Sequence, residues 1–130
     1  MKRELTLTTE PIDERRLVAA REYSKGMGAV VCFLGVVREE ENGERIAAIE
    51  YDAFETMAKH QFGLLFDEIE RRWPVESMRL IHRVGHVAVN QPSLWVEAIA
   101  PHRAEAFAAC LWLIDEMKRV VPIWKRAVAR

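Results

Sequence analysis

The sequence predicts a single α+β domain in which helices pack on a largely antiparallel sheet. Its 130 residues fit one domain, because domains commonly run to about 100–150 residues. Apolar residues make up 50% of the chain and charged residues 30%, which excludes disordered and fibrous proteins. Hairpin-like strand signals alternate with two long amphipathic segments, and this mixture favours a sheet with helices on it. We therefore treat residues 1–130 as one unit.

The first half of the chain predicts three strands and one helix. Residues 5–8 alternate between apolar and polar side chains as a short strand does, and residues 11–23 form a helix that a proline opens. The β-branched run at 29–37 predicts a strand that is buried on both faces. An Asn-Gly pair at 42–43 then predicts a tight hairpin turn, and residues 45–51 are the returning strand.

The second half predicts two long helices and three further strands. Apolar residues recur at helical spacing over residues 54–69, and the Trp-Pro pair at 73–74 ends that helix. Three strand-like segments follow, at residues 78–84, 86–89 and 94–100. A last helix covers residues 102–121 and stops at Pro122, which cannot continue it.

Composition also limits the classes of function. The 19 Lys and Arg residues and the 20 Asp and Glu residues give a net charge of −1, so the chain has no basic coat for nucleic acid. We expect a cytoplasmic protein away from membranes, because we find neither a signal peptide nor the ~20 apolar residues of a membrane span. Cys32 and Cys110 lie in apolar runs and are expected to be buried free thiols. The four histidines do not cluster, so we predict no metal site and no cofactor.

The last predicted helix carries two cations on its apolar side. On a helical wheel centred on Ile114, the core face contains Phe107, Cys110, Leu111, Met117 and Val121. Lys118 lies about 40° and Arg103 about 20° from that centre. An unpaired buried charge costs several kcal/mol, so either these side chains extend their charged ends into water or they serve a site. Trp112 lies about 160° from the centre, so we expect it to be exposed or covered by a partner.

The segment from the end of this helix onward is basic and has no acidic residue. Its cations are Lys118, Arg119, Lys125, Arg126 and Arg130. Because Pro122 ends the helix, the chain should turn there and bring Lys125 near Lys118. Two lysines without a carboxylate suit an anionic ligand and an amine that acts as a general base or nucleophile. A solvated basic tail is the alternative, and the apolar pair at 123–124 beside it suits an extended peptide.

Three further cations lie where strand ends and helix ends meet. Arg38 follows the strand at 29–37, and His102 and Arg103 begin the last helix. Positive charge at a helix N-terminus is unfavourable unless an anion binds there. Arg103 and Lys118 are about 22 Å apart along one helix, so a pocket that uses both must include a second copy of the chain. The sequence therefore predicts a symmetric homodimer with composite sites.

Two other polar groups carry a structural interpretation. His82 and Arg83 lie between Ile81 and Val84, which predicts a strand whose polar face meets solvent. The glutamates around the Asn-Gly turn form an acidic hairpin tip, which we interpret as a solvated turn. The sequence shows no carboxylate pair poised for acid–base chemistry, no phosphate-binding glycine loop and no nucleophile elbow.

Several segments resemble the large, catalytic subunit of molybdopterin synthase. GAVVCFLGVVR at 28–38, IEYDAF at 49–54 followed by Met-Ala at 57–58, and IHRVG at 81–85 follow that family in order and spacing. The most specific blocks are APHRAEAF at 100–107, IDEMK at 114–118 and VPIWKR at 121–126. One departure is Ala127, where the family often has an acidic residue.

The resemblance implies an α/β-hammerhead fold and a sulfurtransferase of molybdenum cofactor biosynthesis. Members of the family convert cyclic pyranopterin monophosphate into molybdopterin. Their sulfur arrives as a thiocarboxylate on the C-terminal Gly-Gly of a small ubiquitin-like carrier subunit. The family's assembly is a heterotetramer built on a homodimer of large subunits, so the resemblance implies both partners.

The resemblance also assigns roles to individual residues. Lys118 and Lys125 match the family's catalytic lysines. The substrate-binding positions match Arg38, His102, Arg103, Phe33 and Ile114. The alternative function is a non-catalytic dimeric module that binds a carrier protein or a phosphorylated ligand. A nucleic-acid-binding module is a third class, but the sequence lacks exposed aromatic residues on a basic strand face.

Overall fold

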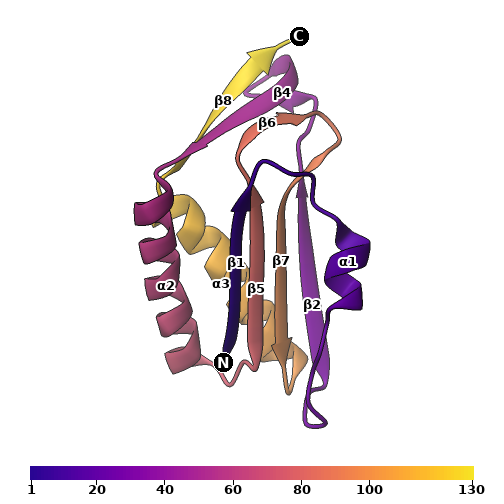
Figure 1. Cartoon of the computed structure of the whole chain (residues 1–130), viewed down its shortest axis with the longest axis vertical. Helices are drawn as coiled ribbons and strands as arrows, with labels where there is room; N and C mark the ends of the chain where they lie inside the picture. Colours follow the sequence, from indigo (N-terminus) through magenta and orange to yellow (C-terminus); the bar gives the residue numbers. More distant parts are fainter.

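The computed structural model describes residues 1–130 and confirms the α+β class. Its elements are β1 (Lys2–Thr8), α1 (Glu14–Ala19), β2 (Ala29–Val36), β3 (Glu40–Glu41), β4 (Glu44–Ala53), α2 (Glu55–Arg72), β5 (Ser77–Arg83), β6 (Gly85–Ala88), β7 (Pro92–Ala100), α3 (Arg103–Val120) and β8 (Ile123–Ala129). Figure 1 shows a larger sheet with a smaller sheet at one end of it. None of the three helices is long and apolar enough to span a membrane.

The larger sheet supports the main hydrophobic core. Its strand order is β1-β5-β7-β2, with β1 parallel to β5 and the other two pairings antiparallel. Leu80 of β5 and Val96 of β7 face α2 and α3, and both are fully buried. Phe62, Ile69 and Leu113 meet them from the two helices. This layer fixes the C-terminal end of α3 beside one end of the sheet (Figure 1).

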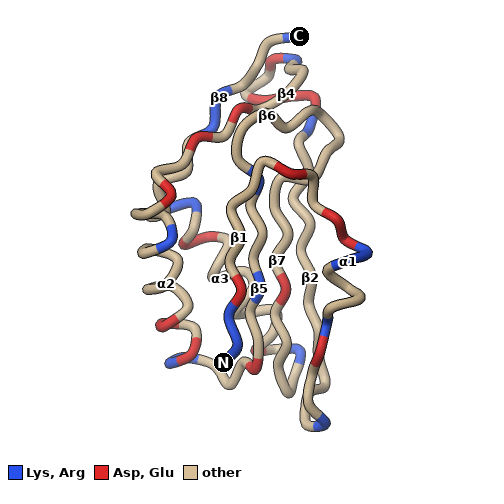
Figure 2. The backbone as a smooth tube through the Cα atoms, viewed as in Figure 1, with Lys and Arg blue, Asp and Glu red and all other residues tan.

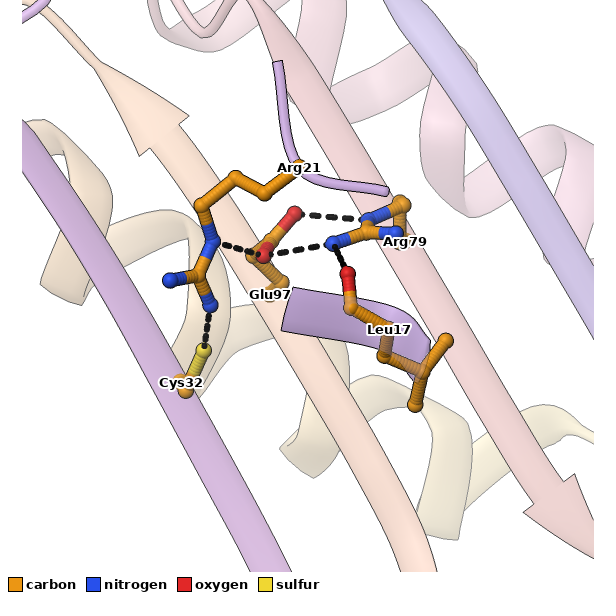
Figure 3. A network of polar contacts seen from close by, with 5 residues as sticks. All are labelled: Leu17, Arg21, Cys32, Arg79 and Glu97. Carbon is orange, nitrogen blue, oxygen red and sulfur yellow. Dashed lines mark hydrogen bonds and ion pairs between the residues drawn. The ribbon is translucent and has the colours of Figure 1, made fainter. Parts of the chain in front are cut away.

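The opposite face of the larger sheet carries an ion-pair network that holds α1 (Figure 3). The fully buried carboxylate of Glu97 accepts two hydrogen bonds from Arg79, at 2.7 and 2.8 Å, and one from Arg21 at 2.7 Å. Arg79 also donates to the carbonyl oxygen of Leu17 in α1, at 2.8 Å. Burial alone raises the pKa of Glu97, but the hydrogen bonds from both arginines outweigh it and hold this pKa below its usual value.

The smaller sheet forms around β4. Its order is β3-β4-β6, and β8 pairs antiparallel with β4 as well. The predicted Asn-Gly hairpin is confirmed between β3 and β4, with φ of 53° at Asn42 and 80° at Gly43, as a type I′ turn requires. The strand before the hairpin is only the two-residue β3, however, because β2 pairs with β7 and not with β4.

The prediction that the strand at 29–37 is buried on both faces was wrong. β2 is an edge strand, and its outward side chains Val30, Leu34 and Val36 are exposed. The apolar run resembles a central strand, but in the single chain no element covers this part of the outer face. Cys32 lies on the same face and is exposed, and Arg21 donates to its sulfur at 3.1 Å.

The buried stripe of α3 is rotated from the predicted one. The buried residues of the helix are Ala106, Ala109, Cys110, Leu113, Ile114 and Met117, and their centre lies about 70° from Ile114 on the wheel. Phe107 and Leu111, expected in the core, are 61% and 62% exposed. Trp112, expected opposite the core, packs against Trp73 with ring centroids 6.0 Å apart. The rotation arises because α3 contacts both the sheet and α2, and the second contact lies on the side of Trp112.

Two further boundaries differ from the prediction. α1 ends at Ala19 and does not reach residue 23. Residues 123–129, treated as a basic tail, form the strand β8. The carbonyl of Pro122 accepts a hydrogen bond from the backbone N–H of Phe54 at 3.2 Å, so the turn after α3 is fixed to the junction between β4 and α2. That turn sends β8 back along β4.

Candidate functional site

A cavity of about 660 Å³ lies where the end of α3, the exit of β2 and the smaller sheet meet. Three cations from three segments line it: Arg38 after β2, Lys118 in the last turn of α3, and Lys125 in β8. A smaller hollow of about 410 Å³ lies beside Arg79 and Glu97 on the other face of the sheet, where these charged groups already pair with each other. The larger cavity is therefore the candidate site.

The turn at Pro122 brings the two predicted lysines to one cavity. Lys118 is on the exposed edge of α3, and β8 runs antiparallel to β4 so that Lys125 lies opposite Tyr51. Both lysines line the cavity although they belong to different elements. Lys118 makes no hydrogen bond or ion pair with another side chain, so its amine is available to a ligand.

Lys125 has a carboxylate partner that the sequence analysis missed. Its Nζ donates to Oε1 of Glu41 at 2.9 Å, and Glu41 also lines the cavity. The prediction of a merely solvated acidic turn was therefore wrong for Glu41. The Asn-Gly turn folds β3 against β4, and this places Glu41 beside β8. Figure 2 shows cationic residues in β8 running beside anionic residues in β4.

The other predicted binding residues divide between the cavity and the rest of the molecule. Phe33 and Arg38 line the cavity. A Cβ at Gly35 would lie 3.2 Å from the ring of Phe33, so a glycine at this position avoids a close contact with that ring. Ile114 belongs to the main core and does not line the cavity.

His102 and Arg103 lie at the other end of α3, away from this cavity. The carboxylate of Glu105 accepts a hydrogen bond from the backbone N–H of His102 at 2.9 Å. A carboxylate in the first turn favours the helix dipole, so this helix start is balanced within the chain. One copy of the chain therefore does not bring the five predicted cationic residues together.

His82 belongs to the cavity wall, although the sequence analysis placed it on a solvated face. It is 5% exposed and lines the cavity beside Tyr51. Burial lowers the pKa of His82, with a smaller opposing effect from its hydrogen bond to the carbonyl oxygen of Arg83. The available signal was the alternation of β5: Met78 and Leu80 face the core, so the residue at 82 must point the same way.

A comparison with known protein families decides what kind of chain this is. The family described as MoaE protein matches residues 7–120. The chain belongs to the MoaE protein family. It is similar to the molybdopterin synthase catalytic subunit of Staphylococcus carnosus, at 34% identity over 128 residues that cover 97% of this chain and 83% of that protein.

Solved structures of MoaE proteins share the fold. Molybdopterin synthase from Staphylococcus aureus matches with a TM-score of 0.85 and 31% identity, covering 98% of this chain and 90% of that one. A chain in the protein-protein complex of subunits 1 and 2 of molybdopterin-converting factor from Helicobacter pylori matches with a TM-score of 0.75 and 24% identity, covering 98% and 88%. The second match supports the fold alone.

In this MoaE protein, the cavity suits acid–base and anion chemistry performed by side chains. No group of three or more His, Cys, Asp or Glu residues is placed to hold a metal ion. The cavity instead combines a free amine at Lys118, a paired amine at Lys125, a guanidinium at Arg38 and the imidazole of His82. Such a set can bind an anionic group at one end and leave one amine free to react.

Proposed function

We propose that this cavity is the site where sulfur is transferred to a pterin substrate. The chain is a molybdopterin synthase catalytic subunit and converts cyclic pyranopterin monophosphate into molybdopterin. The observation that carries the assignment of the site is the meeting of Lys118, Lys125 and Arg38 in one cavity. These cations come from three segments that are distant in the sequence. Side chains that only faced solvent would have no reason to meet in one cavity.

Lys118 is the catalytic amine in this proposal. It has no carboxylate partner, and it lies in the last turn of α3 at the cavity wall. The thiocarboxylate sulfur bonds to the pterin carbon, and water then adds to the acyl carbon to give a tetrahedral intermediate with a negatively charged oxygen. Cleavage of the acyl C–S bond leaves the sulfur on the pterin and a carboxylate on the carrier. An ammonium group stabilises the charge of this intermediate, and a neutral amine accepts a proton at the carbon that receives sulfur. Removal of such a group commonly costs about 10²–10⁴-fold in rate.

Lys125 and the surface next to it receive the sulfur carrier. A small ubiquitin-like carrier with a C-terminal thiocarboxylate presents an extended, anionic tail. The exposed rings of Phe54 and Trp124 pack edge to face, with centroids 4.9 Å apart, beside Lys125. An apolar surface next to a cation suits the last residues of such a tail. The negatively charged end of the tail would replace Glu41 as the ion-pair partner of Lys125.

A second copy of the chain completes the site by supplying His102 and Arg103. Phe107 and Leu111 form an exposed apolar stripe on α3 between Arg103 and Lys118. Arg103 and Lys118 lie at nearly equal distances on either side of Leu111. If two α3 helices pack antiparallel through this stripe, a twofold axis near Leu111 places Arg103 of one copy opposite Lys118 of the other. The partner's cations and Arg38 then bind the substrate phosphate.

Subunit complementation tests both the catalytic role and the composite site. We expect Lys118→Ala and Arg103→Ala each to abolish product formation from cyclic pyranopterin monophosphate and thiocarboxylated carrier. A one-to-one mixture, dissociated and reassembled, should regain about a quarter of wild-type activity, because half of the dimers are mixed and each of these has one intact site. The matched control is Arg119→Ala, next to Lys118 but paired with Glu116, which should stay active.

Two results would contradict the proposal. Near-full activity of Lys118→Ala would remove this residue from catalysis. A reassembled mixture as inactive as its parents, with mixed dimers present by native mass spectrometry, would show that each site is contained in one chain. Thermal unfolding of each variant separates these results from a loss of folding.

A further inference from the structure

We propose that His82 is a substrate-positioning residue of this cavity: its Nε2 accepts a hydrogen bond from an N–H or O–H group of the bound pterin. The inference rests on the proposed sulfur-transfer site and adds a contact that none of its cations can make. It follows from how the imidazole is held, which nitrogen carries the proton, and what surrounds the other nitrogen.

The ring of His82 is fixed in the cavity wall. Its centroid lies 5.1 Å from that of Tyr51, with the rings at 79° to each other, and its Nδ1 lies 2.6 Å from the carbonyl oxygen of Arg83. The guanidinium of Arg83 in turn donates to Gln91 at 3.1 Å and to the carbonyl of His86 at 3.3 Å. These contacts fix the position of Arg83, whose carbonyl oxygen binds Nδ1 of His82. The imidazole ring therefore has one orientation.

This hydrogen bond decides the tautomer of His82. A carbonyl oxygen only accepts hydrogen bonds, so Nδ1 must carry the proton. Burial lowers the pKa of the ring, so the imidazole is neutral at pH 7 and Nε2 holds a free lone pair. His82 is thus an acceptor at Nε2.

Nε2 is open to the cavity. Nε2 has no hydrogen-bond partner in the chain. If it were also fully buried, it would be a buried side-chain atom without a partner, but the one atom of that kind is Nε of Arg83. Nε2 of His82 is therefore not sealed in. Because His82 lines the cavity and is only 5% exposed, the small accessible part of this side chain includes Nε2. A donor group of a ligand in the cavity can therefore reach this lone pair and form a hydrogen bond with it.

The surroundings select the kind of group that binds there. The titratable and charged groups that line the same cavity are Tyr51 of β4, Glu41 of β3, Arg38 after β2, Lys118 of α3 and Lys125 of β8. The cations attract the phosphate, whereas a lone pair on a neutral ring repels phosphate oxygens. A pterin presents N–H groups at its end away from the phosphate. His82 thus orients the substrate, with the pterin ring toward β5 and the phosphate toward the cations.

Two substitutions separate acceptance of a hydrogen bond from packing. His82→Gln keeps an acceptor oxygen at similar reach, and His82→Leu keeps apolar bulk without an acceptor. We expect His82→Leu to weaken binding of cyclic pyranopterin monophosphate by about tenfold, the range of one lost hydrogen bond with an unsatisfied donor. His82→Gln should stay within about threefold of wild type. KM should follow the binding constant, while kcat changes far less.

The pH profile of binding gives a readout that a packing role would not move. Protonation turns Nε2 from an acceptor into a donor, so wild-type affinity should fall as the pH drops through the pKa of His82, below its usual 6.5. His82→Gln has no such transition, so its affinity relative to wild type should rise over the same range. Titrations use the enzyme with its carrier in the carboxylate form, which binds without turnover.

The control is His86→Gln, on β6, which follows β5 in the chain but belongs to the smaller sheet. His86 lies outside the cavity and pairs with Glu50 at 2.7 Å, so substrate affinity should not change. Unchanged affinity in a folded His82→Leu, or equal loss in both His82 variants, would overturn the inference. If His82→Leu does not fold, the pH profile of His82→Gln decides alone. Failure of the proposed function would differ, because the wild-type enzyme would then form no product.

Discussion

Replacement of Glu97 by Gln should lower the free energy of unfolding by about 3–5 kcal/mol, the cost of removing one partner from a buried ion pair. Glu97 is 0% exposed and faces two guanidinium groups, those of Arg79 and Arg21. Glutamine has nearly the same volume, so the change leaves packing intact. The substitution removes the negative charge. The amide NH₂ group of the glutamine is a hydrogen-bond donor, and it faces guanidinium N–H groups that are donors as well. The buried guanidinium of Arg79 and the half-buried one of Arg21 then remain without this counter-ion (Figure 3).

Thermal unfolding followed by circular dichroism measures this loss. For 130 residues, an unfolding entropy of about 2.1 cal/mol/K per residue converts 3–5 kcal/mol into a Tm about 11–18 °C lower. Adding Arg79→Met to the variant removes one unpaired cation and should recover part of the loss, which a double-mutant cycle quantifies. Glu70→Gln is the matched control: it pairs with Arg3 at the surface, so its effect on Tm should be much smaller.

The sign of the pH dependence follows from the lowered pKa of Glu97. The unfolded chain binds this proton more readily than the folded one, with an ordinary pKa of 4.5. The stabilisation is therefore complete above that pH and is lost as the pH falls through the folded-state pKa. Wild type should lose more stability than Glu97→Gln on acidification. A Tm for Glu97→Gln within about 3 °C of wild type, less than 1 kcal/mol by the same conversion, would refute the reasoning.

Two remaining predictions concern packing and thiol access. Gly28→Ala should destabilise the fold by about 1–3 kcal/mol in urea unfolding, because its Cβ would lie 2.5 Å from the carbonyl oxygen of Pro101. Gly26→Ala, with nothing within 4 Å, should be nearly neutral, and an equal effect of both would contradict this. Burial raises the pKa of both thiols, that of Cys110 to about 11, but only Cys32 is exposed, so a thiol reagent at pH 8 should label Cys32 in the native protein and Cys110 only after unfolding. Peptide mass mapping distinguishes the two, and early labelling of Cys110 would count against its burial.

Most of the fold could be predicted because its longer elements have clear periods. The apolar repeat of α2 and the Asn-Gly turn of the hairpin determine local structure with little help from the rest of the chain. β8 could not be predicted in this way. Its residues alternate weakly and most are exposed, so it is a strand only because the turn at Pro122 directs it along β4. Strand formation of this kind depends on its neighbours more than on its own sequence.

The site could be predicted only in part, because some of its residues follow a local sequence pattern and others depend on distant neighbours. Lys118 stood out because a cation near the apolar side of a helix needs an explanation, and the structure places it in the cavity. Glu41 could not be found from its sequence, because its value depends on pairing with Lys125, 84 residues further along the chain. The resemblance assigns Ile114 to substrate binding, but its side chain is buried in the main core, where the helical wheel centred on it already predicts it. His102 and Arg103 lie away from the cavity in one chain, and we propose that a second copy supplies them, as the length of helix between Arg103 and Lys118 predicts.

The charges in the cavity divide the work of binding and reaction. If neither lysine had a carboxylate partner, a phosphate or carboxylate group of a ligand would be attracted equally to both. Neither amine would then remain available for the reaction. Glu41 forms an ion pair with Lys125, so Lys118 is the lysine of this cavity that has no carboxylate partner in the chain. An anionic carrier tail can compete with Glu41 for Lys125, whereas the neutral acceptor of His82 competes for no anion at all. In the proposed function, this arrangement directs the carrier tail toward β8 and the pterin ring toward β5, and the amine of Lys118 on α3 acts where the two meet.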